Sequence, residues 1–132
     1  MIDSRTKILI VDDELSSRRI MEKIIRNQWK CNLFLADDGA EALKIMLKEL
    51  PNLVILDMVM PFMSGIQVLQ TMRKTTKLAK INVLIYTAVD DNRIVKEVLK
   101  YGVLDYLVKP VNKEILVGKL TKLFEKINLV SN

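Results

Sequence analysis

Five short apolar segments alternate with five segments of helical periodicity along the chain, and this alternation restricts the fold more than any other feature. The apolar segments predict strands at residues 6–11, 31–36, 52–57, 81–87 and 104–108. Most of them are continuously apolar, which indicates burial on both faces, as in a parallel sheet. The segments between them repeat apolar residues every three or four positions, as helices with one buried face do. Five strand–helix units in succession therefore predict an α/β fold, in which right-handed crossovers place helices on both faces of one sheet.

Residues that begin and end helices support this segmentation. Asp38 and Ser64 each precede a Glu or Gln by three positions, which is the spacing of a capping box. Three more residues suit the helix limits that the alternation requires: Pro51, Gly102 and Asn112. Gly118 does not suit the last predicted helix, in which it lies, because a glycine inside a helix costs about 1 kcal/mol relative to alanine. A close contact with the sheet or a partner surface would each explain it.

Polar residues stand where the predicted strands end. Asp12 and Asp13 follow the first strand, Asp57 ends the third, Thr87 ends the fourth and Lys109 follows the fifth. Because ligands in open α/β sheets bind at the carboxyl ends of the strands, we expect these side chains to converge on one pocket. Three carboxylates, one hydroxyl and one ammonium suit Mg²⁺ and a phosphoryl group.

The three carboxylates are candidate ligands of Mg²⁺, which binds one or two carboxylates together with waters and a phosphate oxygen. Asp13 and Asp57 could bind the ion directly, and Asp12 could bind it through water. Clustered carboxylates repel one another, so we expect at least one raised pKa when no metal is bound. The alternative for Asp12 and Asp13 is that they only cap the helix that follows near Leu15. The second acidic strand end, at Asp57, weakens that alternative.

Asp57 is the candidate nucleophile, because a carboxylate can attack phosphorus and carry the group as an acyl phosphate. Phosphoryl transfer depends on positioning and charge neutralisation. Lys109 would supply a positive charge, and Thr87 would donate a hydroxyl to another oxygen. Taken alone, Thr87 is more simply a β-branched strand residue and Lys109 a solvated lysine. A cis bond before Pro110 would aim the lysine inward.

Length and composition predict one domain, residues 1–132. No apolar run approaches the roughly 18 residues of a membrane span, and the N-terminus lacks the apolar core of a signal peptide. The one cysteine cannot form an internal disulfide, which suits a reducing compartment. We therefore expect a cytoplasmic protein that does not enter a membrane.

The net charge is +5, and it becomes +8 when Asp12, Asp13 and Asp57 are set aside, since 21 basic residues then face 13 acidic ones. Such an excess suits a nucleic acid or an acidic partner. The basic residues are spread over several helices, however, and no run of five or more occurs. We therefore favour a solvated surface over nucleic-acid binding by this domain.

The chain resembles the receiver domain of two-component response regulators over about residues 5 to 127. Four motifs carry the resemblance, each at a strand end: Asp12-Asp13-Glu14, the segment from Asp57 to Gly65, Thr87-Ala88 and Lys109-Pro110. Each motif is weak alone, whereas four in this order are specific. The resemblance implies a flavodoxin-like three-layer α/β/α sandwich with five helices and a parallel sheet of strand order 2-1-3-4-5. Residues 128–132 would then be a frayed tail or the start of a linker.

The resemblance also implies a function. A phosphohistidine of a sensor histidine kinase or phosphotransfer protein would pass its phosphoryl group to Asp57. The implied Mg²⁺ ligands are Asp12, Asp13, Asp57 and the backbone carbonyl of Val59. Such a domain is a phosphorylation-switched signalling module rather than an enzyme, although it assists its own phosphorylation and slow dephosphorylation. By the same likeness, Tyr106 matches the switch aromatic that moves with Thr87.

The resemblance implies that the phosphorylated state is read on the fourth helix, the fifth strand and the fifth helix. The reader would be an output domain, an effector protein or a second copy of the chain. Charged residues of that surface could pair across a homodimer: Arg93, Lys96, Asp105 and Lys119. The resemblance further implies that Val59 and Val89 flank the path of the water that attacks the acyl phosphate. Neither side chain can orient a water by hydrogen bonding, so we expect a long-lived acyl phosphate.

Other protein classes fit the residues less well. A haloacid dehalogenase phosphatase needs a second Asp two residues after its nucleophile, where this chain has Val59. An FMN-binding flavodoxin needs a Ser/Thr/Gly-rich phosphate loop after the first strand, where this chain is acidic. The sequence contains neither the signature Gly-x-x-x-x-Gly-Lys nor any histidine. These absences exclude a P-loop nucleoside triphosphatase and a phosphohistidine carrier.

Overall fold

The five apolar segments form one parallel sheet in the computed structural model, which describes residues 2–88 and 92–131. The strands are β1 (Lys7–Val11), β2 (Asn32–Ala36), β3 (Leu53–Asp57), β4 (Asn82–Thr87) and β5 (Asp105–Val108). Their order in the sheet is β2-β1-β3-β4-β5, and every neighbouring pair is parallel. Each strand begins one residue later than predicted and ends at the predicted residue. The α/β fold and the strand order 2-1-3-4-5 are therefore confirmed.

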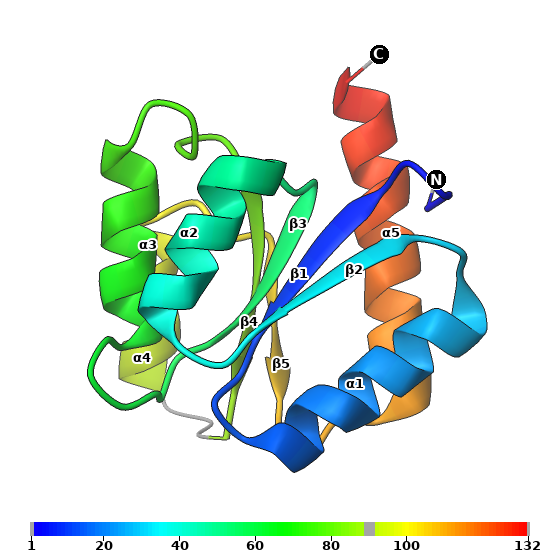
Figure 1. The fold of residues 1–132 in the computed structure, drawn as a ribbon, viewed down its shortest axis with the longest axis horizontal. Helices are drawn as coiled ribbons and strands as arrows, with labels where there is room; N and C mark the ends of the chain where they lie inside the picture. Colours follow the sequence, from blue (N-terminus) through cyan, green and yellow to red (C-terminus); the bar gives the residue numbers. More distant parts are fainter. Residues whose placement is uncertain (1, 89–91, 132) are drawn as a thin grey trace.

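Helices cover both faces of the sheet. In the described ranges they are α1 (Leu15–Gln28), α2 (Gly39–Glu49), α3 (Gly65–Lys74), α4 (Asn92–Leu99) and α5 (Lys113–Ser131). Figure 1 shows α1 and α5 on one face and α2, α3 and α4 on the other, which confirms the three-layer sandwich. The helix α5 extends beyond residue 127, where we expected the core to end. Within the described part of the chain, no helix is both long enough and apolar enough to cross a membrane.

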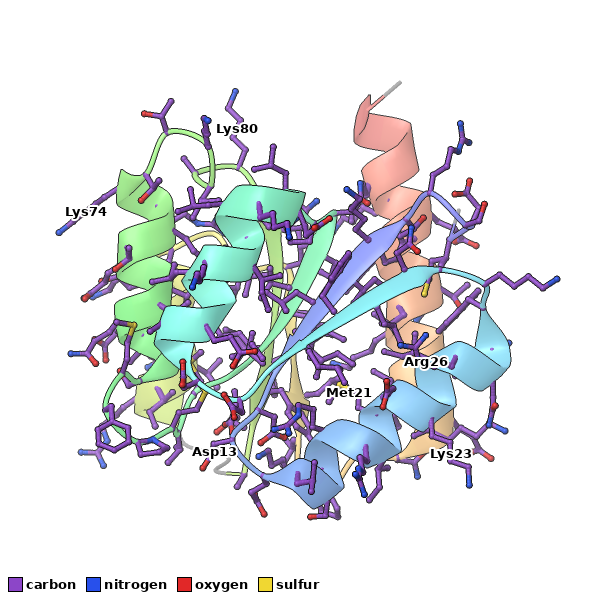
Figure 2. The ribbon with its side chains drawn as sticks, in the orientation of Figure 1. Asp13, Met21, Lys23, Arg26, Lys74 and Lys80 are labelled. Atoms are coloured by element: carbon purple, nitrogen blue, oxygen red, sulfur yellow. The ribbon has the colours of Figure 1, made fainter. Side chains whose placement is uncertain are left out.

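Alternate residues of each strand supply two cores, one on each side of the sheet. Leu9 and Val11 of β1 face the core beneath α2, α3 and α4. Ile8 and Ile10 of the same strand face the core beneath α1 and α5, which also contains Met21. Figure 2 places Met21 between α1 and the sheet. Burial on both faces explains why the strand segments are continuously apolar.

The predicted helix limits are present. Ser64 and Gln67 form a complete capping box at the start of α3. Asp38, before α2, and Asn112, before α5, each accept the backbone N–H three residues later. Gly102 follows α4 with a φ of 71°, in the left-handed region that glycine adopts without steric cost.

Two helical glycines have opposite surroundings. Gly118 is exposed on α5, and beyond the adjacent backbone of its own helix and its chain neighbours no described atom lies within 4 Å of a Cβ built on it. The expected alternative of a close contact between Gly118 and the sheet is therefore wrong. Gly65 begins α3, and a Cβ built there would collide with the carbonyl oxygen of Asp57 and with Met58. The absence of a side chain at Gly65 lets the start of α3 approach the end of β3.

Backbone pairing fixes the strand ends at one edge of the sheet. Asp57 lies opposite Tyr86 in the pairing of β3 with β4, and Thr87 lies opposite Val108 in the pairing of β4 with β5. The N–H of Lys109 donates to the carbonyl of Thr87 at 2.7 Å, which continues the ladder past the end of β5. The backbone therefore sets Asp57, Thr87 and Lys109 at the carboxyl ends of three adjacent strands, each one residue further along the register than the one before.

Candidate functional site

Three carboxylates lie together at the carboxyl ends of the strands. Asp12 and Asp13 follow β1, Asp57 ends β3, and one carboxylate oxygen from each lies within 4.8 Å of the other two. Asp12 and Asp57 are buried, whereas Asp13 is exposed and stands at the lower edge of the molecule in Figure 2. In the same view, the labelled basic residues Lys74 and Lys80 lie at the opposite end of the sheet. The structure thus brings the three predicted acids together.

The ammonium of Lys109 lies among these acids. Its Nζ is 3.0 Å from Asp57 Oδ2 and 3.4 Å from the carboxylates of both Asp12 and Glu14. The lysine side chain is only 11% exposed, so the alternative of a solvated lysine is wrong. The Lys109–Pro110 bond is cis, the form that we expected to accompany an inward lysine.

Both carboxylate oxygens of Asp57 have partners. Oδ1 accepts the backbone N–H of Val59 at 3.1 Å, and Oδ2 accepts from Lys109. Asp57 is 2% exposed, and this burial raises the pKa of its carboxyl from 3.8 to about 6, against the lowering effects of Val59 and Lys109. The charge of Asp12 also raises the pKa, but it is the smallest of these effects. The expected raised pKa is therefore present, with burial rather than mutual repulsion as its main cause.

The lysine is held in its charged form. Burial alone would lower the pKa of Lys109, but the hydrogen bond to Asp57 and the negative charges of Asp57 and Asp12 outweigh it. The pKa of Lys109 is consequently raised above its ordinary value of 10.5. A fixed positive charge therefore lies beside the Asp57 carboxylate, 3.0 Å from Oδ2.

The two carboxylate oxygens of Asp12 differ in their hydrogen bonding. Oδ1 accepts the backbone N–H of Glu14 at 2.9 Å. Oδ2 is buried and makes no hydrogen bond with the residues that the structure describes, although the Lys109 ammonium lies 3.4 Å from it. The N-cap of α1 is Glu14, so helix capping does not explain Asp12 and Asp13. A buried carboxylate oxygen that makes no hydrogen bond is a natural ligand for a cation.

Thr87 and Tyr106 occupy different environments. Thr87 ends β4 and is 1% exposed, whereas Tyr106 on β5 is 36% exposed. The ammonium of Lys119 on α5 lies 5.1 Å from the centroid of the Tyr106 ring and pairs with Asp105 at 3.1 Å. Two of the four residues that could have paired across a homodimer therefore pair within one chain.

Val59 and Val89 were expected to flank the approach of water to Asp57. The side chain of Val59 is largely exposed, at 59%. Val89 lies outside the described residues.

Sequence reasoning missed two residues that contact Lys109. Glu14 belongs to the quoted acidic motif, but nothing in the sequence indicated that it pairs with a lysine near the other end of the chain. Tyr86 looked like one more apolar strand residue, yet its ring centroid lies 4.8 Å from the Lys109 ammonium. The only signal for Tyr86 was its position directly before Thr87.

The sequence of this chain is similar to those of known proteins. The sequence model of the family described as response regulator receiver domain matches residues 8–121. The chain is 36% identical to the chemotaxis protein CheY of Pseudomonas aeruginosa over 122 residues, which cover 92% of this chain and 98% of that protein. It is 35% identical to a probable transcriptional regulator of Porphyridium aerugineum over 97% of this chain but only 52% of that protein.

Solved structures show the same likeness. Chemotaxis protein CheY4 of Vibrio cholerae superimposes with a TM-score of 0.82 at 28% identity, covering 89% of this chain and 97% of that one. The receiver domain of AraT, a response regulator from Geobacillus stearothermophilus, gives a TM-score of 0.85 at 29% identity, covering 96% of this chain and 98% of that one.

Proposed function

Because this chain belongs to the response regulator receiver domain family, we propose that it accepts a phosphoryl group on Asp57 in a Mg²⁺-dependent reaction. The donor is a phosphohistidine of a sensor histidine kinase or of a phosphotransfer protein. One observation carries the proposal: a buried carboxylate, Asp57, has a lysine ammonium 3.0 Å away and two further carboxylates within 4.8 Å. This set of groups suits the binding of a cation and a phosphoryl group together.

The acidic residues fit Mg²⁺. Asp12 supplies a buried oxygen that makes no hydrogen bond with the described residues, Asp13 is open to solvent, and Asp57 completes the cluster. In this proposal these three carboxylates and the backbone carbonyl of Val59 hold the ion. When bound, Mg²⁺ neutralises negative charge on the carboxylates and on the phosphoryl oxygens.

The side chains of this chain have separate roles in the transfer. A carboxylate oxygen of Asp57 forms a bond to phosphorus while the bond from phosphorus to the donor nitrogen breaks, and the leaving imidazole keeps the electron pair. The Val59 N–H fixes the orientation of the Asp57 carboxylate. Lys109 moves its hydrogen bond from Asp57 to a phosphoryl oxygen, and Thr87 donates its hydroxyl to another oxygen.

Phosphorylation would act as a switch rather than as a step of metabolism. Drawing Thr87 toward the phosphoryl group leaves space into which Tyr106 turns, and this changes the surface formed by α4, β5 and α5. A ligand shifts a conformational equilibrium only through contacts that differ between the states, and the hydroxyl of Thr87 supplies one. We propose that an output domain, an effector protein or a second copy of the chain reads this surface in the cytoplasm.

The test is the intact mass of the protein after incubation with acetyl phosphate or carbamoyl phosphate and Mg²⁺. We expect one phosphoryl adduct, labile at alkaline pH, that is lost when Mg²⁺ is chelated. The matched control is Asp57→Asn, which keeps the shape of the side chain and removes the nucleophile. An adduct that persists in Asp57→Asn assigns the acceptor to another residue and contradicts the proposal.

A further inference from the structure

Tyr86 is an unusual residue for its place in the core. It lies in β4 directly before Thr87 and opposite Asp57 in the pairing of β3 with β4. It is 1% exposed and packs in the core beneath α1 and α5, whose other strand residues are aliphatic. A tyrosine at this position brings an aromatic face to the floor of the acidic pocket.

The face of the Tyr86 ring meets the ammonium of Lys109. The distance from Nζ to the ring centroid is 4.8 Å, within the roughly 6 Å over which a cation is attracted by the negative face of an aromatic ring. Lys109 is 11% exposed, so water screens this attraction little. The carboxylates of Asp57, Asp12 and Glu14 surround the same ammonium.

The ring and the carboxylates act on the lysine in different ways. A carboxylate attracts the ammonium strongly but also competes with the phosphoryl oxygen for its N–H groups. An aromatic face attracts the cation without a charge of its own and takes no hydrogen bond of comparable strength. Tyr86 can therefore hold the ammonium near Asp57 while its N–H groups change partner.

We propose that Tyr86 is a positioning residue for phosphoryl transfer, which holds the Lys109 ammonium against Asp57 through the face of its ring. This inference deepens the proposed phosphorylation of Asp57 and rests on it. The ring, rather than the hydroxyl, carries the effect. Burial raises the pKa of the Tyr86 phenol above its ordinary value of 10.0, so the ring stays neutral at physiological pH.

The first test compares rates of phosphorylation by acetyl phosphate, followed by intact mass, for Tyr86→Leu and Tyr86→Phe. Tyr86→Leu removes the aromatic face, and we expect a rate about fivefold lower, equal to about 1 kcal/mol of barrier. Tyr86→Phe keeps the face and should restore the wild-type rate. Leu84→Ala is the matched control, because Leu84 lies two residues earlier in the same strand and the same core, and it should leave the rate unchanged.

The second test separates positioning from a general effect on the fold. In a Lys109→Gln background, Tyr86→Leu should cause no further loss of rate, because Tyr86 acts only through the lysine. An equal fivefold loss in both backgrounds, or an unchanged rate in Tyr86→Leu alone, overturns the inference.

A measurement on the unphosphorylated protein keeps the inference testable if Tyr86→Leu does not fold. In the NMR spectrum, the Cε protons of Lys109 should show an upfield ring-current shift in the wild type and in Tyr86→Phe. Absence of this shift in the wild type refutes the contact. If the shift is present but the wild type takes no phosphoryl group, the proposed function fails, and with it the role of Tyr86 in transfer.

Discussion

Replacing Asp57 by asparagine should stabilise the metal-free protein at pH 8, although the substitution removes an ion pair. Burial raises the pKa of Asp57 from 3.8 to about 6, even with Lys109 3.0 Å away. Each pKa unit corresponds to about 1.4 kcal/mol, so ionised Asp57 costs the folded state about 3 kcal/mol. The asparagine side chain carries no charge and avoids this cost, so we expect the free energy of unfolding to rise by up to about 3 kcal/mol.

The size of this stabilisation depends on pH in a defined window. Because the pKa of Asp57 is higher in the folded than in the unfolded chain, its contribution to stability is fully present below pH 3.8 and is lost as the pH rises through about 6. The advantage of Asp57→Asn should therefore be small near pH 4 and reach its full size above pH 7. Urea unfolding of both proteins across this range in a metal chelator measures it.

Mg²⁺ should reduce the difference in the free energy of unfolding between Asp57→Asn and the wild type. An ion that binds only the folded wild type stabilises it by about 2.7 kcal/mol at 100 times its dissociation constant, and Asp57→Asn should gain less. The matched control is Asp105→Asn, because Asp105 also pairs with a lysine, at 3.1 Å, but is 37% exposed. Loss of that exposed pair should change stability by no more than about 1 kcal/mol. A metal-free Asp57→Asn that is less stable than the wild type at pH 8, or a difference that does not depend on pH, refutes this reasoning.

Four further outcomes follow from particular residues. Gly118→Ala should raise the free energy of unfolding in urea by about 0.5–1 kcal/mol, because alanine is a better helix-forming residue and its Cβ meets no described atom outside its own helix. A loss of stability would indicate contacts that this chain alone does not make. Gly65→Ala should lower that free energy by about 1–3 kcal/mol, because its Cβ collides with the end of β3, and a neutral result would mean that α3 shifts freely. Val59→Asn should speed the decay of the acyl phosphate about tenfold, equal to about 1.4 kcal/mol, because asparagine can orient the attacking water. Unchanged or slower first-order decay in Mg²⁺ buffer would show that the apolar Val59 side chain does not protect the acyl phosphate. A phosphoryl mimic on Asp57 should turn Tyr106 inward in a crystal structure, and an identical Tyr106 rotamer with and without the mimic would show that the coupling does not exist.

The strands and their polar ends were predictable because both signals are local. Continuous apolar runs such as Leu53 to Leu56 indicate strands buried on both faces. The carboxyl ends of parallel strands must meet at one edge, so Asp12, Asp57 and Lys109 could be placed together without any knowledge of their contacts. The strand starts were each off by one residue, because the N-terminal ends carry no polar marker as distinct as these acids.

The features that escaped prediction depend on distances between segments far apart in sequence. Glu14 and Tyr86 contact Lys109 from two different strand ends, and spacing along the chain encodes neither contact. Repulsion was expected to raise the pKa of at least one of the three carboxyls. The pKa of Asp57 is raised, but its main cause is burial, which depends on the packing around the pocket. Gly118 could not be interpreted from sequence, because its explanation turns on whether its surroundings are filled or open.

The most direct test of phosphorylation at Asp57 is to locate the phosphoryl group after transfer from a phosphorylated histidine donor. Borohydride reduces an acyl phosphate to an alcohol, so the acceptor aspartate becomes homoserine and can be found by peptide mass mapping. We predict homoserine at position 57 alone, and only when both the donor and Mg²⁺ were present. Reduction at Asp12 or Asp13, or no reduced residue although the donor has lost its phosphoryl group to the protein, would contradict the assignment of Asp57 as the phosphoacceptor.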